Sequence, residues 1–202
     1  MRVAFYLDTF DKAYWQLAQL AIEGLRKAMP GVTVVHLTTA NGPTLVGLYA
    51  DEELRLNISA AYPRNRILIQ SAVLGEVLFL DVDMLVQHDL SDVWKQDFDV
   101  AMPVVDDPFV KYTGGVCFMR NPDFWKEWLR HDIWKRPFES REHLQAFTQW
   151  VDEDRYKVLR LSHDQFECVP THRWSDTSLA WIVHYRGPRK WWFPGMRHGL
   201  GG

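Results

Sequence analysis

The sequence has few cysteines, no long apolar run and little net charge, and each shortage excludes a class of protein. Its 202 residues include two cysteines, too few for a disulfide framework, so we expect a reducing compartment and a cytoplasmic protein. No apolar stretch reaches the roughly 20 residues that span a bilayer, and the first apolar run breaks at Asp8, too early for a signal peptide. A formal charge of −3 argues against a general nucleic-acid binder.

The residues that are present predict one α/β domain covering 1–202. Apolar residues make up 47% and charged residues 24%, a globular composition. Apolar residues fill 2–7 and 32–37 as strands, and between them a helical period runs from Asp11 to the stop at Pro30-Gly31. Strand, helix and strand in this order form the βαβ unit of a parallel sheet. We therefore expect a mostly parallel central sheet flanked by helices.

Later patterns predict more elements of both kinds. Pro63 suits the first position of a short helix and Gly75 the position past its end. Ser91 suits the cap of a helical turn, and Asn121 with Pro122 suits the start of a helix over 121–134. The other expected elements are a helix at roughly 139–151 and strands at 77–80, 98–105, 112–120, 156–161, near 166–169 and at 179–185.

Two carboxylates follow the strand in EVLFLDVDMLV, residues 76–86. Ligands of open α/β sheets lie beyond the carboxyl ends of strands, and residues i and i+2 of an extended strand point the same way. Asp81 and Asp83 would therefore face one crevice, where like charges beside an apolar wall repel. Solvated turn aspartates would have the same spacing, but a bound Mn²⁺ or Mg²⁺ that also takes phosphate oxygens explains the pair better.

A second motif, WIVHYRGPRKWW at 181–192, ends another apolar strand. A lone histidine is more often a core residue, but His184 leaves a strand end and imidazole is a good Mn²⁺ ligand. Gly187 would let the backbone approach a ligand closely, and Lys190 would place a compact positive charge on a phosphate. Taken with Asp81 and Asp83, the motif predicts a site for a metal and a diphosphate rather than a basic surface tail.

These two motifs together resemble the glycogenin-type retaining glycosyltransferases of family eight, which have the Rossmann-like GT-A fold. The resemblance implies that Asp81, Asp83 and His184 are the Mn²⁺ (or Mg²⁺) ligands. Gly187 and Lys190 then correspond to contacts with the diphosphate of a UDP-sugar. The implied reaction moves a hexose from UDP to an unknown hydroxyl acceptor, with retention of configuration.

Further positions follow from the same resemblance. The opening LDTFDKAYWQLA is similar to the family's first strand end near the uridine, and the segment 186–202 would be a C-terminal tail that closes the donor site. Cofactor-binding roles are thereby implied for Leu7, Asp8, Thr9 and Tyr14, for Arg66 at the phosphates or donor sugar, for Val82 between the aspartates, and for Thr113, Gly114 and Gly115.

The sequence also departs from the family. YTGG at 112–115 lacks the usual asparagine, so Thr113 or backbone amides must substitute for it. The family's catalytic Asp-Gln pair, which accompanies Asp81 and Asp83, has two candidates that stay open. One is Asp164 with Gln165, and the other is Gln145 in a helical position without an aspartate.

Other functions are weighed by what each would need. A nucleotidyltransferase normally has a glycine-rich basic loop after its first strand, and LDTFDKAYW has none. A catalytically silent module that binds a nucleotide sugar or glycan stays open because the asparagine is missing.

His163, Cys168 and His172 fit no common zinc spacing. Either Trp191 or Trp192 is a candidate for the wall of the donor pocket.

Overall fold

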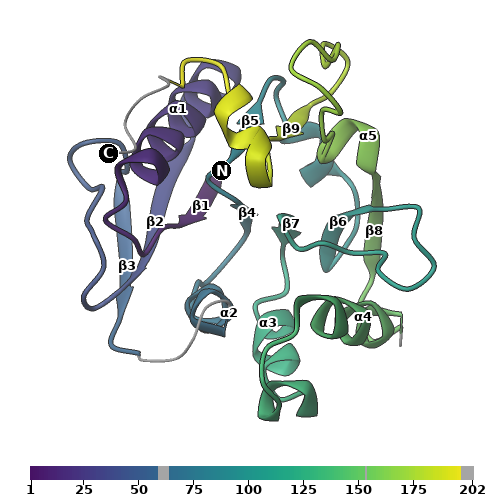
Figure 1. Ribbon diagram of the computed structural model, residues 1–202. Helices are drawn as coiled ribbons and strands as arrows, with labels where there is room; N and C mark the ends of the chain where they lie inside the picture. The colour runs from purple at the N-terminus through teal and green to yellow at the C-terminus, as the bar shows by residue number, and fades with distance from the viewer. Residues whose placement is uncertain (59–63, 153, 197–202) are drawn as a thin grey trace.

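A central sheet of seven strands organises the protein in a computed structural model that describes residues 1–58, 64–152 and 154–196 (Figure 1). The strands are β1 (Arg2–Tyr6), β2 (Thr33–Thr39), β3 (Glu52–Leu56), β4 (Val77–Leu80), β6 (Val100–Val104), β7 (Val116–Met119) and β8 (Val158–Ser162). Their order is β3-β2-β1-β4-β7-β6-β8. β7 is antiparallel to both of its neighbours, whereas the other pairings within this sheet are parallel.

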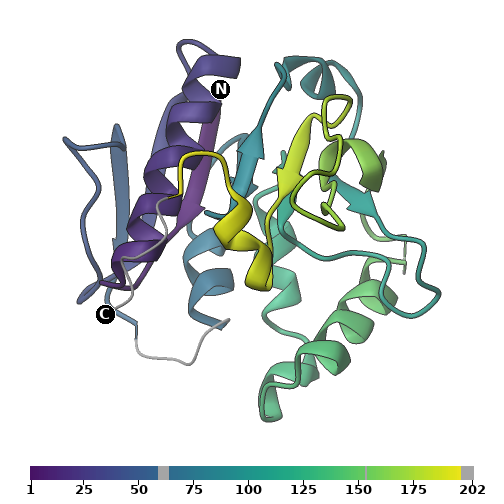
Figure 2. The same ribbon diagram turned by 45° about the horizontal axis from the view of Figure 1, so that its top comes forward.

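Helices cover both faces of the sheet, and a small second sheet lies on one of them (Figures 1 and 2). The helices are α1 (Lys12–Ala28), α2 (Arg64–Ser71), α3 (Asp123–Trp128), α4 (Ser140–Val151) and α5 (His163–Phe166), with 3₁₀ turns η1 (Ser91–Lys95), η2 (Asp132–Lys135) and η3 (Gly187–Trp192). The second sheet pairs β5 (Met84–Val86) with β9 (Ile182–His184) in antiparallel fashion. α1 packs on the face that carries β5 and β9, and α2, α3 and α4 pack on the opposite face.

Alternate residues of the central strands supply two separate cores. Phe5 and Leu78 join the core under α1, whereas Ala4 and Phe79 join the core under α2, α3 and α4. This alternation follows from the two-residue period of a strand. Because both faces are apolar and covered, a cluster of polar side chains that binds a ligand is expected at the ends of the strands.

The carboxyl ends of β1 and β4 form the edge of the sheet where a ligand is expected. The chain runs from β1 outward to β2 and β3 on one side, and β4 lies on the other side of β1. The strand order therefore reverses between β1 and β4, and such a switch point opens a crevice at the carboxyl ends. β7 runs the other way, so the residues before Val116 reach the same edge.

The mixed α/β class with a mostly parallel sheet, predicted from the sequence, is confirmed. Asp11 caps α1 by accepting a hydrogen bond from the N–H of Ala13 at 2.8 Å. The Asn121 side chain accepts the N–H of Asp123 at 3.0 Å at the start of α3. Within the described residues, no helix is both long and apolar enough to cross a bilayer.

Several predicted details are wrong. Near 166–169 the chain forms the end of α5 and a single bridge at Cys168 instead of a strand. The helix expected over 121–134 breaks into α3 and η2. Ser91 was expected to cap η1 but is its first residue. The side chain of Asp89 instead accepts a hydrogen bond from the N–H of Ser91 at 2.9 Å.

The helix expected between Pro63 and Gly75 is shorter than its boundary signals suggested. α2 ends at Ser71, and Gly75 has a φ of 78° in the turn that leads into β4. Pro63 lies outside the described residues. The sequence also gave no sign of β3, a partly exposed edge strand whose Glu, Arg and Leu residues lack a strand pattern.

Candidate metal and nucleotide site

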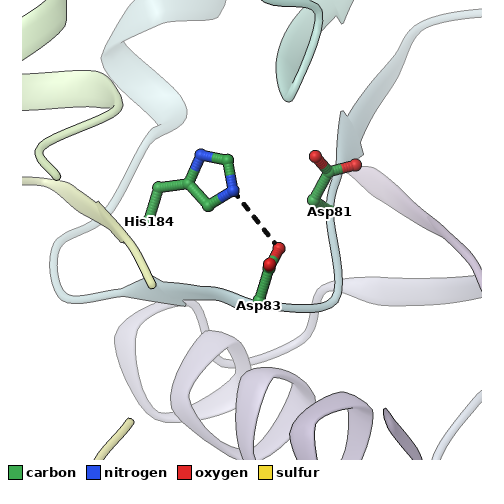
Figure 3. Close-up of side chains that lie close together, drawn as sticks. All are labelled: Asp81, Asp83 and His184. Carbon is green, nitrogen blue, oxygen red and sulfur yellow. Dashed lines mark ion pairs between the residues drawn. The ribbon is translucent and has the colours of Figure 1, made fainter. Parts of the chain in front are cut away.

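Backbone pairing brings Asp81, Asp83 and His184 together at the switch point. Asp81 directly follows β4, and its N–H donates to the carbonyl of Gly115 at 3.1 Å. Asp83 directly precedes β5, in which Met84 lies opposite His184 of β9. The N–H of Tyr185 extends this pairing by donating a hydrogen bond to the carbonyl of Asp83 at 2.9 Å. The side chains of both motifs therefore face a common space (Figure 3).

The three side chains form a set of ligands suited to a divalent ion. One ligand atom from each of Asp81, Asp83 and His184 lies within 4.8 Å of the others, and this is the sole such group of three found in the described part of the chain. His184 Nε2 is 3.3 Å from Asp83 Oδ1. For all three ligand atoms to bond one ion at roughly 2.1 Å, they would have to move slightly closer to one another. Two carboxylate oxygens and an imidazole nitrogen fit Mn²⁺.

Carboxylates and cationic side chains lie close together in this site, and each shifts the pKa of its neighbours. Burial by itself would raise the pKa of Asp83, but the hydrogen bond and charge of His184 and the charge of Lys190 lower it to about 2. Burial would lower the pKa of His184, but hydrogen bonds to Asp83 and Glu167 raise it to about 9. Burial raises the pKa of Asp81, against the opposing charge of Arg66 at 2.5 Å. The carboxylates are thus held against cationic side chains.

Glu167 belongs to this site and was missed by sequence reasoning. It is 0% exposed, its Oε1 lies 3.0 Å from His184 Nδ1, and its Oε2 accepts a hydrogen bond from Thr113 Oγ1. The bridge between Cys168 and Val183 places it beside β9. By engaging Nδ1, Glu167 orients the Nε2 of His184 toward the aspartates, as carboxylates do behind metal-bound histidines.

Gly115 leaves the space that the acidic groups need. A Cβ at this position would lie 2.6 Å from Met84 Cε and 3.2 Å from both Asp81 Oδ2 and Glu167 Oε1. The neighbouring Gly114 has a φ of 69°, a conformation that side chains disfavour. The glycine pair therefore lets the start of β7 pass directly beside the carboxylates.

A cavity of about 500 Å³, called here the larger cavity, opens over the aspartates. Lys190 of η3 reaches into it, donating to the Tyr14 hydroxyl at 3.0 Å and lying 3.2 Å from Asp83 Oδ2. The cavity brings together most of the predicted donor-site residues. It is lined by Tyr6, Leu7, Asp8, Thr9, Tyr14, Asn65, Arg66, Asp81, Val82, Asp83 and Lys190.

Asp8 ties the ends of β1 and β2 together at the rim of the larger cavity. Its Oδ1 accepts hydrogen bonds from the Thr38 hydroxyl at 3.1 Å and from the Thr39 hydroxyl at 2.6 Å. A Cβ at Gly42 would lie 2.1 Å from the same oxygen, so the loop after β2 must pass close by. Thr38 and Thr39 carry no sequence signal, because threonines are common in strands.

The Asp-Gln candidates are not brought to the larger cavity. The Asp164 side chain is fully exposed, and Gln165 is exposed in α5. Gln145 lies on α4 and is not part of the larger cavity's wall. The physical reason for the first pair is that α5 turns the chain so that Glu167, two residues later, points inward instead.

The other predicted positions are placed as follows. Thr113 and Gly114 line a neighbouring cavity together with Arg66 and Asp81, and Gly187 begins η3 with a φ of 62°. Trp191 and Trp192 do not line the larger cavity. His163, Cys168 and His172 form no ligand group in the described part of the chain.

No family model and no curated protein matches the sequence. Solved structures do match. The glycosyltransferase GlyE of Streptococcus pneumoniae TIGR4 in its apo form is 17% identical with a TM-score of 0.64, and the match covers 93% of this chain and 54% of that one. This chain therefore spans about half the length of GlyE.

Two further neighbours are similar over nearly their whole length. The galactosyltransferase LgtC, solved with donor and acceptor sugar analogues, is 16% identical with a TM-score of 0.59, covering 93% of this chain and 88% of that one. A glycosyltransferase involved in glycosylation of the major capsid of PBCV-1 is 13% identical with a TM-score of 0.62, covering 94% and 96%. These likenesses show that the chain shares the fold of glycosyltransferases, in the arrangement of a single GT-A domain.

Proposed function

We propose that this protein is a metal-dependent glycosyltransferase that moves a hexose from a UDP-sugar to a hydroxyl acceptor, with retention of configuration. The observation that carries the proposal is the convergence of Asp81, Asp83 and His184 at the switch point of the sheet. LgtC, which shares the fold, was solved with donor and acceptor sugar analogues, which supports a donor and an acceptor of this kind.

In this proposal the larger cavity holds the nucleotide. Its wall near β1, formed by Leu7, Asp8 and Thr9 with Tyr14, takes the uridine. Lys190 contacts the diphosphate, and Gly187 lets the backbone of η3 come close to it. Val82 lines the wall between the aspartates. The C-terminal segment, of which residues 186–196 are described and 197–202 lie outside the described residues, would then close the donor site.

The cationic side chains make the diphosphate a better leaving group. Lys190 and Arg66 lie on either side of the aspartates and would stabilise charge that develops on the phosphates. A bound Mn²⁺ would add Lewis-acid stabilisation of the same charge. Arg66 also donates to the carbonyl of Gly114 at 2.9 Å, which supports a donor sugar near the start of β7. Thr113, Gly114 and Gly115 would then lie where that sugar meets its acceptor.

The proposal is tested by UDP binding and by UDP release from UDP-hexoses, each with Mn²⁺ and with EDTA. Asp83→Ala removes a buried ligand and should abolish both Mn²⁺-dependent binding and turnover. Asp92→Ala, an exposed aspartate paired with Lys95, is the matched control and should behave as wild type. Unchanged UDP affinity in the Asp83 variant with Mn²⁺ would count against the site.

A catalytically silent nucleotide-sugar binder is the second candidate. The exposed position of Asp164 favours it, because neither Asp164 nor Gln165 lines the larger cavity. The same experiment separates the two: a transferase slowly releases UDP from its donor in the presence of Mn²⁺, whereas a silent module binds UDP and releases none.

A further inference from the structure

A second cavity, called here the aromatic cavity, adjoins the larger one. It has a volume of about 330 Å³ and lies against α2, α3, η2 and α4. Arg66 and Asp81 line both cavities, so the two spaces meet at the acidic site. The wall is formed by Arg66, Ile67, Asp81, Thr113, Gly114, Trp125, Trp128, Trp134, Phe138, Ser140, His143, Leu144 and Phe147.

The wall of the aromatic cavity consists mainly of rings that hold one another in place. Trp125 and Phe147 stack with centroids 5.7 Å apart, and Trp128 packs edge-on against Trp134 at 5.8 Å. Trp134 is fixed further because its Nε1 donates to the carbonyl of Trp128 at 3.1 Å. Phe138 at the rim remains 44% exposed. Fixed rings offer flat apolar faces at little entropic cost to a ligand.

Two buried polar atoms of residues in this wall favour a ligand that is not purely apolar. His143 is 5% exposed and Trp125 is 2% exposed, and His143 Nε2 and Trp125 Nε1 have no hydrogen-bond partner within the described part of the chain. His143 Nδ1 is already engaged, 2.9 Å from the carbonyl of Glu139. A buried polar atom without a partner costs stability, so a ligand that carries hydroxyl groups is favoured over a hydrocarbon.

A pyranose ring combines the two properties that this wall requires. Its C–H faces can lie on Trp134 and Phe138, while its hydroxyl groups would pair with the buried nitrogens of His143 and Trp125 after a small shift of these side chains. We propose that the aromatic cavity binds a pyranose unit of a glycan acceptor and directs one of its hydroxyl groups toward Arg66 and Asp81, where the larger cavity begins. This inference rests on the proposed function, because it takes the larger cavity to hold the donor.

The test measures sugar binding without turnover. Lactose, maltose, cellobiose and the methyl glycosides of glucose, galactose and mannose are titrated into the protein, with tryptophan fluorescence and saturation-transfer NMR as readouts. Cyclohexanemethanol is the apolar comparison. At least one pyranoside should bind saturably and more tightly than the comparison. UDP with Mn²⁺ is titrated into the same samples.

Three variants locate the binding. Trp134→Ala removes a ring, Ser140→Trp fills the mouth of the cavity from an exposed position, and His143→Phe keeps a ring but loses Nε2. Each should weaken pyranoside binding about tenfold or more and leave UDP–Mn²⁺ affinity unchanged. Trp174→Ala, at a tryptophan that is 81% exposed, is the control and should change neither. Melting curves identify any variant that has lost its fold.

The outcomes separate this inference from the proposed function. If UDP–Mn²⁺ binds and no pyranoside does, or if Trp174→Ala weakens pyranoside binding as much as the cavity variants do, the inference is overturned. If the cavity variants weaken the binding of UDP-hexose but not that of UDP, the aromatic cavity holds the donor sugar and the inference is again overturned. If pyranosides bind as expected but UDP–Mn²⁺ does not, the proposed function fails and the cavity remains a glycan site.

Discussion

At the scale of single residues, the site is a set of carboxylates whose positions depend on partners from distant segments. Asp83 lies within 3.3 Å of both Lys190 and His184, and Glu167 engages the remaining imidazole nitrogen. Asp83, His184 and Glu167 are buried and Lys190 is half-buried, so the charge of each group depends on its neighbours for stabilisation. Removing one partner should therefore change a measurable property of the others.

Glu167→Ala should weaken Mn²⁺ binding by roughly 10- to 100-fold, the usual effect of losing a carboxylate behind a metal-bound histidine. Isothermal titration of Mn²⁺ in the presence of UDP measures this. The control is Glu23→Ala, an exposed residue of α1. Equal affinities in wild type and the Glu167 variant would show that this carboxylate does not orient His184.

The sequence supports the prediction of Asp81, Asp83 and His184 because Asp81 follows an apolar strand, Asp83 lies two residues further on, and His184 ends another apolar strand. Glu167 could not be predicted in this way. A single glutamate has no periodic pattern, and its burial depends on the bridge between Cys168 and Val183, which forms only in the folded chain. The Asp-Gln pair beside it attracted attention by resemblance, yet Asp164 is exposed.

At the scale of elements, η3 connects the C-terminal segment to the larger cavity. It lies between α1 and β9 in both views (Figures 1 and 2). Lys190 contacts Tyr14 of α1 and Asp83 ahead of β5, while Phe193 packs against Tyr185 with centroids 5.0 Å apart. One short turn thus bridges three parts of the chain around the larger cavity.

Lys190→Gln should separate nucleotide binding from metal binding. Loss of one charged hydrogen bond to a phosphate costs roughly 1.5–3 kcal/mol, so UDP–Mn²⁺ affinity should fall by about one to two orders of magnitude. Affinity for Mn²⁺ alone should not fall, because Asp83 loses a competing cation. Arg186→Gln, an exposed basic residue in the same segment, is the control. A parallel loss of both affinities would contradict this role.

Elements with strong periodicity were predictable, and those defined by tertiary contacts were not. α1 carries five buried residues on one face, so its pattern is evident in the sequence. Among the described strands β3 pairs with β2 alone, and it is partly exposed, so its EELRL sequence does not resemble a buried strand. The segment near Phe166 is apolar enough for a strand, but the chain turns into α5 there.

At the scale of the whole molecule, both cavities lie at one edge of the sheet and share Arg66 and Asp81. The two cores on either side of the sheet hold that edge in place. Donor and metal should therefore bind the folded chain as a unit and stabilise it by mass action.

UDP and Mn²⁺ together should raise the melting temperature. At a ligand concentration of about 100 Kd the free energy of unfolding rises by about 2.7 kcal/mol, or roughly 5–10 °C for a domain of this size. Differential scanning fluorimetry measures the shift, with EDTA in place of Mn²⁺ as the control. An identical rise with EDTA would mean that UDP binds without a metal.

The central claim is that Asp81, Asp83 and His184 hold one divalent ion together with a diphosphate. A crystal soaked in MnCl₂ and UDP, with diffraction collected to reveal anomalous scattering from manganese, tests it most directly. The account predicts one strong peak bonded to a carboxylate oxygen of each aspartate, to His184 Nε2 and to phosphate oxygens of UDP. A manganese peak elsewhere with UDP bound, or UDP bound in the larger cavity with no peak between these side chains, would contradict it.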